Sequence, residues 1–241
     1  MKIELQYKRY SEKSILIEWP PKIDENSLRK ILLVKKSVEK FYGKLIVEVV
    51  FTYNSLLIYY ASTIEDFYSE VLSLKSLCNA KFGGVLVKNK LWKIPVCYAS
   101  SLAMDLDVFT KDKNLSIDEV IALHTSSVYT VYFMGFLPGF LYLGGLHKKL
   151  FCDRKITPSP KIEKGAVAIG GNQTGIYPVE SPGGWHVIGR CPVDFFDPNK
   201  EDCCFVSPGD RIQFVSISEK KYNDISSLFF HGLYTPEFVF E

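Results

Sequence analysis

The chain lacks the residue spacings that mark a structural metal site. None of its six cysteines forms a C-x-x-C pair, and its four histidines show neither H-x-H nor H-x-x-x-H spacing. Structural zinc sites are usually built from such pairs, so we expect no metal site. We interpret all six cysteines as free thiols in a reducing compartment and expect a cytoplasmic protein.

Charge clusters and long apolar runs are also missing. Lys plus Arg number 29 against 27 Asp plus Glu, and no block of five like charges occurs, so we expect no nucleic-acid partner. The most apolar run, residues 45–61, contains Glu48 and is broken by the turn dipeptide Asn54-Ser55. It predicts two strands and no membrane span. The N-terminus has no apolar segment of the kind a signal peptide needs.

Secondary-structure signals divide the chain near residue 90. The order ββαββα favours a small ferredoxin-like α/β sandwich, one antiparallel sheet with two helices, over residues 1–90. The predicted elements are strands at 3–9 and 14–19, a helix from a cap at Asp24 or Asn26 to Gly43, strands at 44–53 and 55–61, and a helix from Thr63 to about Lys81 that Gly83-Gly84 ends.

Residues 91–241 predict a β-rich second domain. A strand near 91–98 is followed by helices at 105–114 and 116–125, the latter opened by a Ser116–Glu119 capping box. From Val128 to about Glu219 the sequence offers only short apolar runs between Gly and Pro turns, which indicates a β-barrel or sandwich. The aromatic tail, residues 228–240, either packs on this core or, if exposed, forms a protein interface.

The glycine-rich segment 135–145 does not resemble a nucleotide-binding loop. It has neither the Lys nor the hydroxyl of a P-loop, and the strand–turn–helix context of a dinucleotide site is missing. It predicts a tight turn at a barrel rim with packed aromatic side chains.

The run from Gln173 to Trp185 is the strongest candidate for a functional site. Its glycines, Gly183 and Gly184 among them, let backbone amides approach a ligand, while Gln173 and Tyr177 add neutral hydrogen-bonding groups. A few polar groups beside an aromatic wall describe a small-molecule site. The alternative is a pair of β-turns around a buried Trp.

Three charged or titratable side chains have two interpretations each. His124 ends a predicted helix and is either a satisfied structural residue or a proton-transfer group. Arg190 either binds a carboxylate bidentately or forms a surface ion pair. His186 could face either side of a strand. No G-x-S-x-G segment exists, so no serine nucleophile is predicted.

Several motifs in register resemble the family of the 5-oxoprolinase B subunits, which includes the sporulation kinase inhibitor KipI and proteins labelled allophanate hydrolase subunit 1. The matching segments are 119–124, 131–140, 142–146, 167–170, 173–178, 181–185, 188–190 and 208–211. Their order and spacing fit over about residues 94–218.

The resemblance implies a cyclophilin-like β-barrel and a heteromeric enzyme. The expected partners are a homologue of the family's C subunit (KipA-like) and its A subunit. The complex would use ATP to open 5-oxoproline, a cyclic amide, to glutamate. Two alternatives remain open: a KipI-like inhibitor of a sporulation histidine kinase, and a urea-processing subunit of the carboxyltransferase or allophanate hydrolase type.

Under the leading interpretation, site roles fall on residues of the matching segments. His124 is the candidate proton-transfer group, Gln173 and Tyr177 orient the substrate, and the amides near Gly183 and Gly184 hold an anionic group. The remaining predicted substrate-binding residues are Phe140, Ser181, Trp185 and Arg190.

Three segments depart from the family pattern. The usual Gly-Gly-Glu-Phe-Gly-Pro-Asp-Leu is replaced by Ala99–Leu106. The usual Pro-Arg repeat is reduced to Asp153-Arg154 and Pro158-Ser159, so one arginine is absent, and a Pro-Ala-Gly-Ser turn has become Glu163–Ala166. No family role is therefore carried to positions 99–103, 159 or 166, and a changed substrate or weakened catalysis follows as an expectation.

Overall fold

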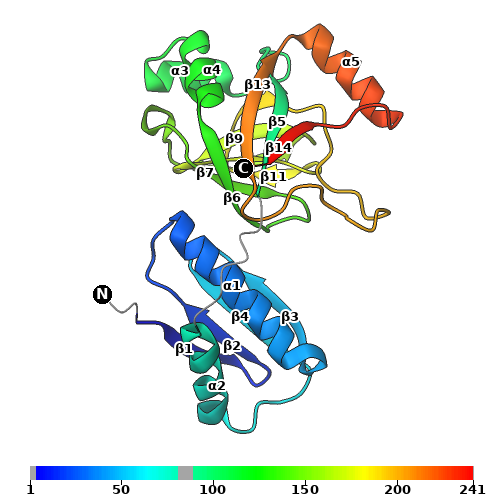
Figure 1. The fold of residues 1–241 in the computed structure, drawn as a ribbon. Helices are drawn as coiled ribbons and strands as arrows, with labels where there is room; N and C mark the ends of the chain where they lie inside the picture. The colour runs from blue at the N-terminus through cyan, green and yellow to red at the C-terminus, as the bar shows by residue number, and fades with distance from the viewer. Residues whose placement is uncertain (1–3, 81–88, 241) are drawn as a thin grey trace. The chain divides into compact units, whose positions relative to one another are not determined.

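The computed structural model describes residues 4–80 and 89–240, and the chain divides into two compact units, 1–87 and 88–241 (Figure 1). Each unit has its own hydrophobic core, and each is described by itself. Within the described residues, no helix combines the length and the apolar character needed to cross a bilayer.

The N-terminal unit is one four-stranded antiparallel sheet with two helices. Its strand order is β1-β2-β4-β3. Side chains of both helices, such as Val34 and Leu74, join inward residues of the sheet, such as Ile17 and Ile58, in one buried cluster. The elements are β1 (Gln6–Ser11), β2 (Ser14–Glu18), α1 (Glu25–Tyr42), the 3₁₀ turn η1 (Gly43–Leu45), β3 (Ile46–Phe51), β4 (Ser55–Tyr60) and α2 (Phe67–Asn79).

Local sequence signals explain the ends of α1. The Asp24 carboxylate accepts hydrogen bonds from the backbone N–H groups of Asn26 and Ser27 at 3.0 and 3.1 Å, which satisfies two first-turn donors. Gly43 follows the helix with φ 51°, a conformation that glycine adopts without strain. The predicted cap at Asp24 and end at Gly43 are confirmed.

The predicted start of α2 at Thr63 is wrong. Asp66 caps the helix instead, because its carboxylate accepts from the N–H groups of Tyr68 and Ser69 at 3.0 and 3.1 Å. An aspartate caps with a charged acceptor, and this one lies closer in sequence to the first buried helical side chain, Val71. The predicted stop at Gly83-Gly84 lies outside the described residues.

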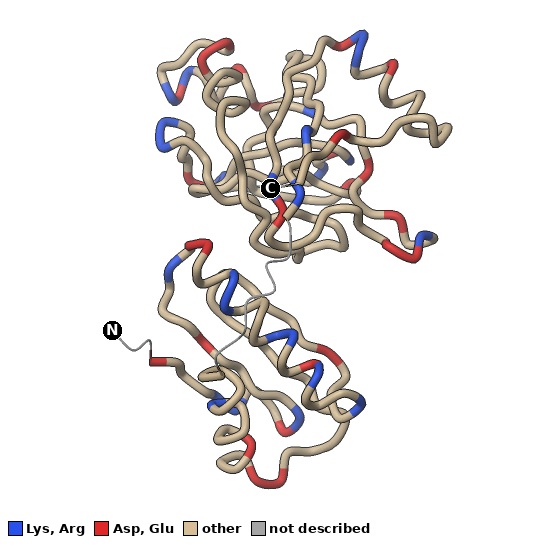
Figure 2. The backbone as a smooth tube through the Cα atoms, in the orientation of Figure 1, with Lys and Arg blue, Asp and Glu red and all other residues tan. Residues whose placement is uncertain are grey.

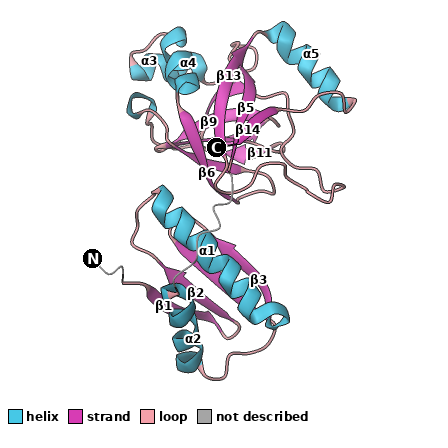
Figure 3. Cartoon of the chain, viewed as in Figure 1, coloured by secondary structure: helices cyan, strands magenta, loops and turns pink. Residues whose placement is uncertain are grey.

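The C-terminal unit is a closed seven-stranded β-barrel with added strands and helices (Figure 3). The order β12-β9-β10-β7-β6-β13-β5 returns to β12 through the Arg190–Cys97 pair, and β14 pairs with the barrel strand β5 from outside. The strands are β5 (Lys90–Cys97), β6 (Val128–Met134), β7 (Leu141–Gly144), β8 (Ser159–Ile162), β9 (Ala166–Gly170), β10 (Gln173–Ile176), β11 (Ser181–Gly183), β12 (His186–Arg190), β13 (Arg211–Ile217) and β14 (Glu237–Phe240). The mixed α+β fold class with a C-terminal barrel is confirmed.

In the described part of the C-terminal unit, three helices flank the barrel, and the sequence predicted the first two of them. They are α3 (Leu106–Lys113), α4 (Ile117–Ser126) and α5 (Glu219–Phe230), with a 3₁₀ turn η2 (Lys148–Leu150). The capping box of α4 is present: Glu119 N–H donates to the Ser116 hydroxyl at 3.2 Å, and Ser116 N–H donates to the Glu119 carboxylate at 2.8 Å.

The aromatic tail divides between the end of α5 and β14. The Phe238 ring lies 4.7 Å from the Trp92 ring, so part of the tail packs on the barrel. Phe240, at the end of β14, keeps 61% of its surface exposed.

Strands β9 and β10 carry different clusters on their two faces. Val167, Ile169 and Ile176 point into the barrel core, whereas Ala168 and Tyr177, the residue that follows β10, join a smaller cluster on the outer face. The two-residue period of a strand therefore decides which residues of the Gln173–Trp185 run enter the core and which border the outer cluster.

Candidate functional site

A pocket of about 260 Å³ lies on the outer face of the barrel. It is bordered by the 135–140 turn, the segment before β8, and the β11 region. Its lining residues are Phe136, Phe140, Tyr142, Arg154, Pro158, Tyr177, Pro182, Gly183, Gly184 and Trp185. Five residues that the sequence predicted for the site, Phe140, Tyr177, Gly183, Gly184 and Trp185, are thus brought together.

Edge-to-face aromatic contacts form the wall of the pocket. The Phe140 ring meets the Tyr177 ring at 5.2 Å and the Trp185 ring at 5.5 Å, both nearly perpendicular. Phe140 is 2% exposed and Trp185 4% exposed. Such packing fixes the rings and presents a preformed apolar surface.

Gly183 and Gly184 differ in how much space their neighbours leave for a side chain. A Cβ on Gly183 would lie 2.2 Å from the Tyr177 hydroxyl, whereas the nearest atom to a Cβ on Gly184 would be 3.6 Å away. Neither residue is among the described positive-φ positions. Gly183 is therefore required by the close approach of Tyr177, a reason that the sequence does not reveal.

Tyr177 is a neutral hydrogen-bonding group in the wall of the pocket. Burial raises the pKa of its phenol to about 12, although a hydrogen bond from the Trp185 backbone N–H opposes that shift. At neutral pH the hydroxyl keeps its proton and can donate it to a ligand carbonyl oxygen.

Two consecutive turns shape the rim. Leu137 N–H donates to Gly135 C=O at 2.8 Å around Phe136, whose φ is 66°, and Phe140 N–H donates to Leu137 C=O at 3.0 Å around Pro138 and Gly139. Pro followed by a glycine with φ 82° fits a type II turn. The predicted tight turn with packed aromatics is confirmed, and it exposes the Phe136 ring at the mouth of the pocket.

The placement of His124 argues against the predicted proton transfer. Its side chain is fully buried and stacks on Phe214 at 4.6 Å. The Tyr98 hydroxyl lies 2.7 Å from Nδ1, and the Thr174 hydroxyl lies 3.0 Å from Nε2. Burial lowers the pKa of the imidazole to about 3. A neutral histidine with both ring nitrogens bonded inside the barrel cannot reach a ligand in the outer pocket.

The hydrogen bonds also define the tautomer of His124. Thr174 donates its single hydroxyl proton to the Ala168 carbonyl at 3.0 Å, so its oxygen accepts from His124. The ring therefore carries its proton on Nε2 and accepts from Tyr98 at Nδ1.

Arg190 and two neutral residues do not line the pocket either. Arg190 forms an ion pair with Glu163 and donates from Nε to the Lys164 carbonyl at 3.0 Å, which leaves its fork engaged within the chain. The Ser181 hydroxyl is buried without a hydrogen-bond partner among the described residues. Gln173 lies at the start of β10 and borders the outer face one residue before Thr174.

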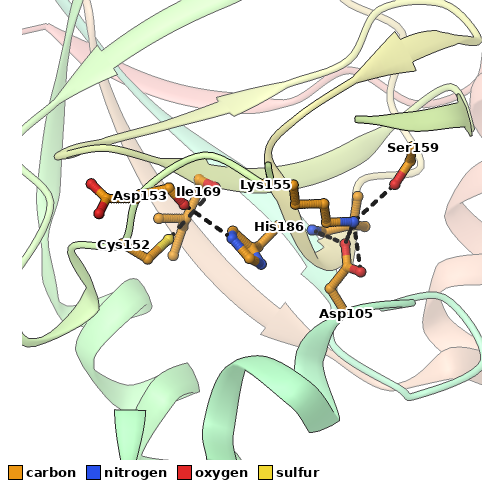
Figure 4. A network of polar contacts seen from close by, with 8 residues as sticks. Asp105, Cys152, Asp153, Lys155, Ser159, Ile169 and His186 are labelled. Atoms are coloured by element: carbon orange, nitrogen blue, oxygen red, sulfur yellow. Dashed lines mark hydrogen bonds and ion pairs between the residues drawn. The ribbon is translucent and has the colours of Figure 1, made fainter. Parts of the chain in front are cut away.

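A charged network that the sequence did not single out joins Asp105, Lys155 and Ser159 (Figure 4). Lys155 Nζ lies 2.7 Å from each carboxylate oxygen of Asp105 and donates to the Ser159 hydroxyl at 2.9 Å. Asp105 also accepts from Val187 N–H at 2.7 Å. Lys155 and the pocket residue Arg154 lie between the glycine-rich segment and β8. The charged residues of that segment are the sequence feature that could have indicated the network.

Along the described backbone of the C-terminal unit, Lys and Arg are interspersed with Asp and Glu (Figure 2). Among the residues that line the pocket, Arg154 alone is charged. In the described part of the chain, no three His, Cys, Asp or Glu residues are grouped as metal ligands. The arrangement can bind a small molecule that has an apolar body and an anionic group.

Comparison with known proteins shows the class of protein to which this fold belongs. The family model "Carboxyltransferase domain, subdomain C and D" matches residues 5–206, so the chain belongs to that family. The crystal structure of Kluyveromyces lactis urea carboxylase aligns with a TM-score of 0.80 over 99% of this chain and 24% of that one. At 19% identity, the likeness to urea carboxylase concerns the fold alone.

Curated relatives narrow the class. The B subunit of 5-oxoprolinase from Haemophilus influenzae is 33% identical over 205 residues, which cover 85% of this chain and 94% of that protein. Its counterpart from Bacillus subtilis is 44% identical over 137 residues, which cover 57% of each chain. The predicted resemblance is confirmed, and the chain spans little more than half the length of the Bacillus subtilis relative in that match.

Proposed function

We propose that this chain is the B subunit of an ATP-dependent 5-oxoprolinase and that the outer pocket binds the cyclic amide. The observation that carries the proposal is the aromatic pocket built on the Gln173–Trp185 run, in a chain whose named relatives are 5-oxoprolinase subunits. The five pocket residues that the sequence predicted lie in segments that match the family.

The pocket suits a compact lactam. At about 260 Å³ it has room for a five-membered ring, and the rings of Phe140 and Trp185 would flank that ring. The neutral Tyr177 phenol would donate to the lactam carbonyl oxygen. Resonance makes the amide bond unreactive, and transfer of the γ-phosphoryl group of ATP to that oxygen, with release of ADP, would make the lactam carbon electrophilic. Water would add to that carbon and the C–N bond would break, with a proton taken up by the ring nitrogen. The resulting acyl phosphate would then be hydrolysed to glutamate and phosphate.

The nucleotide fits a partner protein better than this pocket. Triphosphate sites combine several cations or N–H donors with Mg²⁺, whereas this pocket has one guanidinium. We therefore expect ATP to bind a homologue of the A subunit, with a homologue of the C subunit completing the complex. The six free cysteines support assembly in a reducing compartment, the cytoplasm.

The test is co-expression of the full chain with the homologous A and C subunits, followed by measurement of 5-oxoproline-dependent ADP release. We expect release from the complete complex and none when this chain is left out. A well-formed complex that releases no ADP with 5-oxoproline would contradict the proposal.

A pair of conservative variants locates the reaction. Tyr177→Phe keeps the ring and removes the donor, so we expect kcat/KM to fall about tenfold or more. Tyr68→Phe is the matched control, because Tyr68 is 81% exposed in the N-terminal unit. Equal activity of both variants and the wild type would exclude the pocket as the amide site.

A further inference from the structure

The mouth of the pocket carries one cation, Arg154. Its guanidinium carbon lies 5.7 Å from the centre of the Trp185 ring. Its charge opposes the effect of burial on the pKa of both Tyr142 and Tyr177, so its field reaches the polar atoms of the pocket. Because both tyrosines keep their protons at neutral pH, neither phenol neutralises that field.

The backbone on either side of Arg154 is tied to the pocket wall. Lys155 N–H donates to the Gly184 carbonyl at 2.7 Å. Figure 4 shows the second contact, in which the His186 ring nitrogen Nε2 lies 3.1 Å from the Asp153 carbonyl. These bonds attach residues 153 and 155 to the segment that includes Trp185. The backbone of Arg154 is thereby positioned beside the pocket before a ligand binds.

The adjacent lysine, in contrast, has its charge neutralised. Lys155 and Asp105 form a close ion pair whose side chains are only 17% and 15% exposed. Among the described residues, Arg154 forms no such ion pair with a carboxylate. At the pocket mouth, the Arg154 guanidinium is thus available to an incoming anion, whereas the charge of Lys155 is neutralised by Asp105.

We propose that Arg154 is the specificity-determining residue of the pocket and binds the carboxylate of a small carboxylic acid whose ring or amide part rests on Trp185. The assignment rests on the proposed function for its ligand, 5-oxoproline, and adds the group that recognises it. The planar guanidinium can donate two parallel hydrogen bonds to a carboxylate, which gives it both affinity and orientation.

The experiment compares two ligands that differ by the carboxylate. Binding of 5-oxoproline and of 2-pyrrolidinone, the same lactam without that group, is measured by ligand-observed NMR on the full chain. We expect the wild type to prefer 5-oxoproline by about tenfold or more. Arg154→Gln should abolish the preference while leaving 2-pyrrolidinone binding unchanged, and Arg154→Lys should retain part of it.

Arg29→Gln is the control, because Arg29 is exposed in the N-terminal unit and should leave the preference intact. A ratio of affinities that is the same in the wild type and in Arg154→Gln overturns the assignment, and so does a wild type that binds neither compound. A wild-type chain that shows the preference but releases no ADP in the complete complex would overturn the proposed function alone.

Discussion

Strand β10 separates two polar environments. They differ in whether their polar side chains have hydrogen-bond or ion-pair partners within the chain. On the barrel side, Thr174 joins Tyr98 and His124 in a chain of hydrogen bonds that ends on a backbone carbonyl. On the outer side, Gly175 makes room for the rings of Phe140 and Trp185, and the nearby guanidinium of Arg154 has no carboxylate partner among the described residues.

The difference supports our proposal that the outer side binds the ligand. A buried polar network whose members satisfy one another stabilises and specifies the core. A preformed apolar pocket with one available cation can gain a new interaction from an incoming anion. His124, for which the sequence predicted a catalytic role, therefore lies in the inner network. Arg154, for which it predicted none, lies beside the pocket that we propose as the binding site.

Of these predictions, acid should have the largest effect, because it disrupts the inner hydrogen-bond network around His124. The pKa of His124 is about 3 in the folded chain and about 6.5 when unfolded, so protonation favours unfolding. Its contribution is fully present above pH 6.5 and is lost at about 1.4 kcal/mol per pH unit as pH falls towards 3. Urea unfolding at a series of pH values measures the loss.

NMR signals of the His124 imidazole provide the control for this prediction. Nitrogen chemical shifts should show His124 as the neutral Nε2–H tautomer at pH 5, while His147 and His231, which lie in more exposed positions, supply the comparison signals in the same sample. An imidazole signal from His124 that titrates near pH 6 would contradict a sealed inner network.

Adding one methyl group should distort the outer face with an intermediate effect. Gly183→Ala places a Cβ 2.2 Å from the Tyr177 hydroxyl, so we expect it to cost about 1–3 kcal/mol of unfolding free energy and to weaken 5-oxoproline binding. Gly184→Ala is the matched control, because its nearest contact is 3.6 Å. Equal stability of the two variants would show that Tyr177 does not occupy that space.

Arg190 should give the smallest effect. It pairs with Glu163, whose side chain is 56% exposed, and such pairs contribute about 1 kcal/mol or less. We expect Arg190→Gln to leave the preference for 5-oxoproline over 2-pyrrolidinone unchanged, in contrast to Arg154→Gln. Loss of that preference in Arg190→Gln would contradict this prediction and show that Arg190 takes part in binding.

Much of the fold was predictable because its signals are local. The Asp24 cap, the Gly43 end and the Ser116–Glu119 capping box depend on hydrogen bonds within a few residues, and each is present. The start of α2 was missed because Thr63 and Asp66 are both competent caps, and Asp66 is the one whose carboxylate accepts from the first-turn N–H groups of Tyr68 and Ser69.

For the site, the sequence by itself determined that the Gln173–Trp185 run and the 135–140 turn carry the glycines and aromatic rings of a pocket. Only the tertiary structure decided which polar residues border it. Alternation along β10 directs Thr174 and its partner His124 inward, and long-range contacts hold Arg154 beside Trp185, 31 positions away in sequence. Pairings between distant segments are set by how the barrel closes, and local pattern carries no information about that closure.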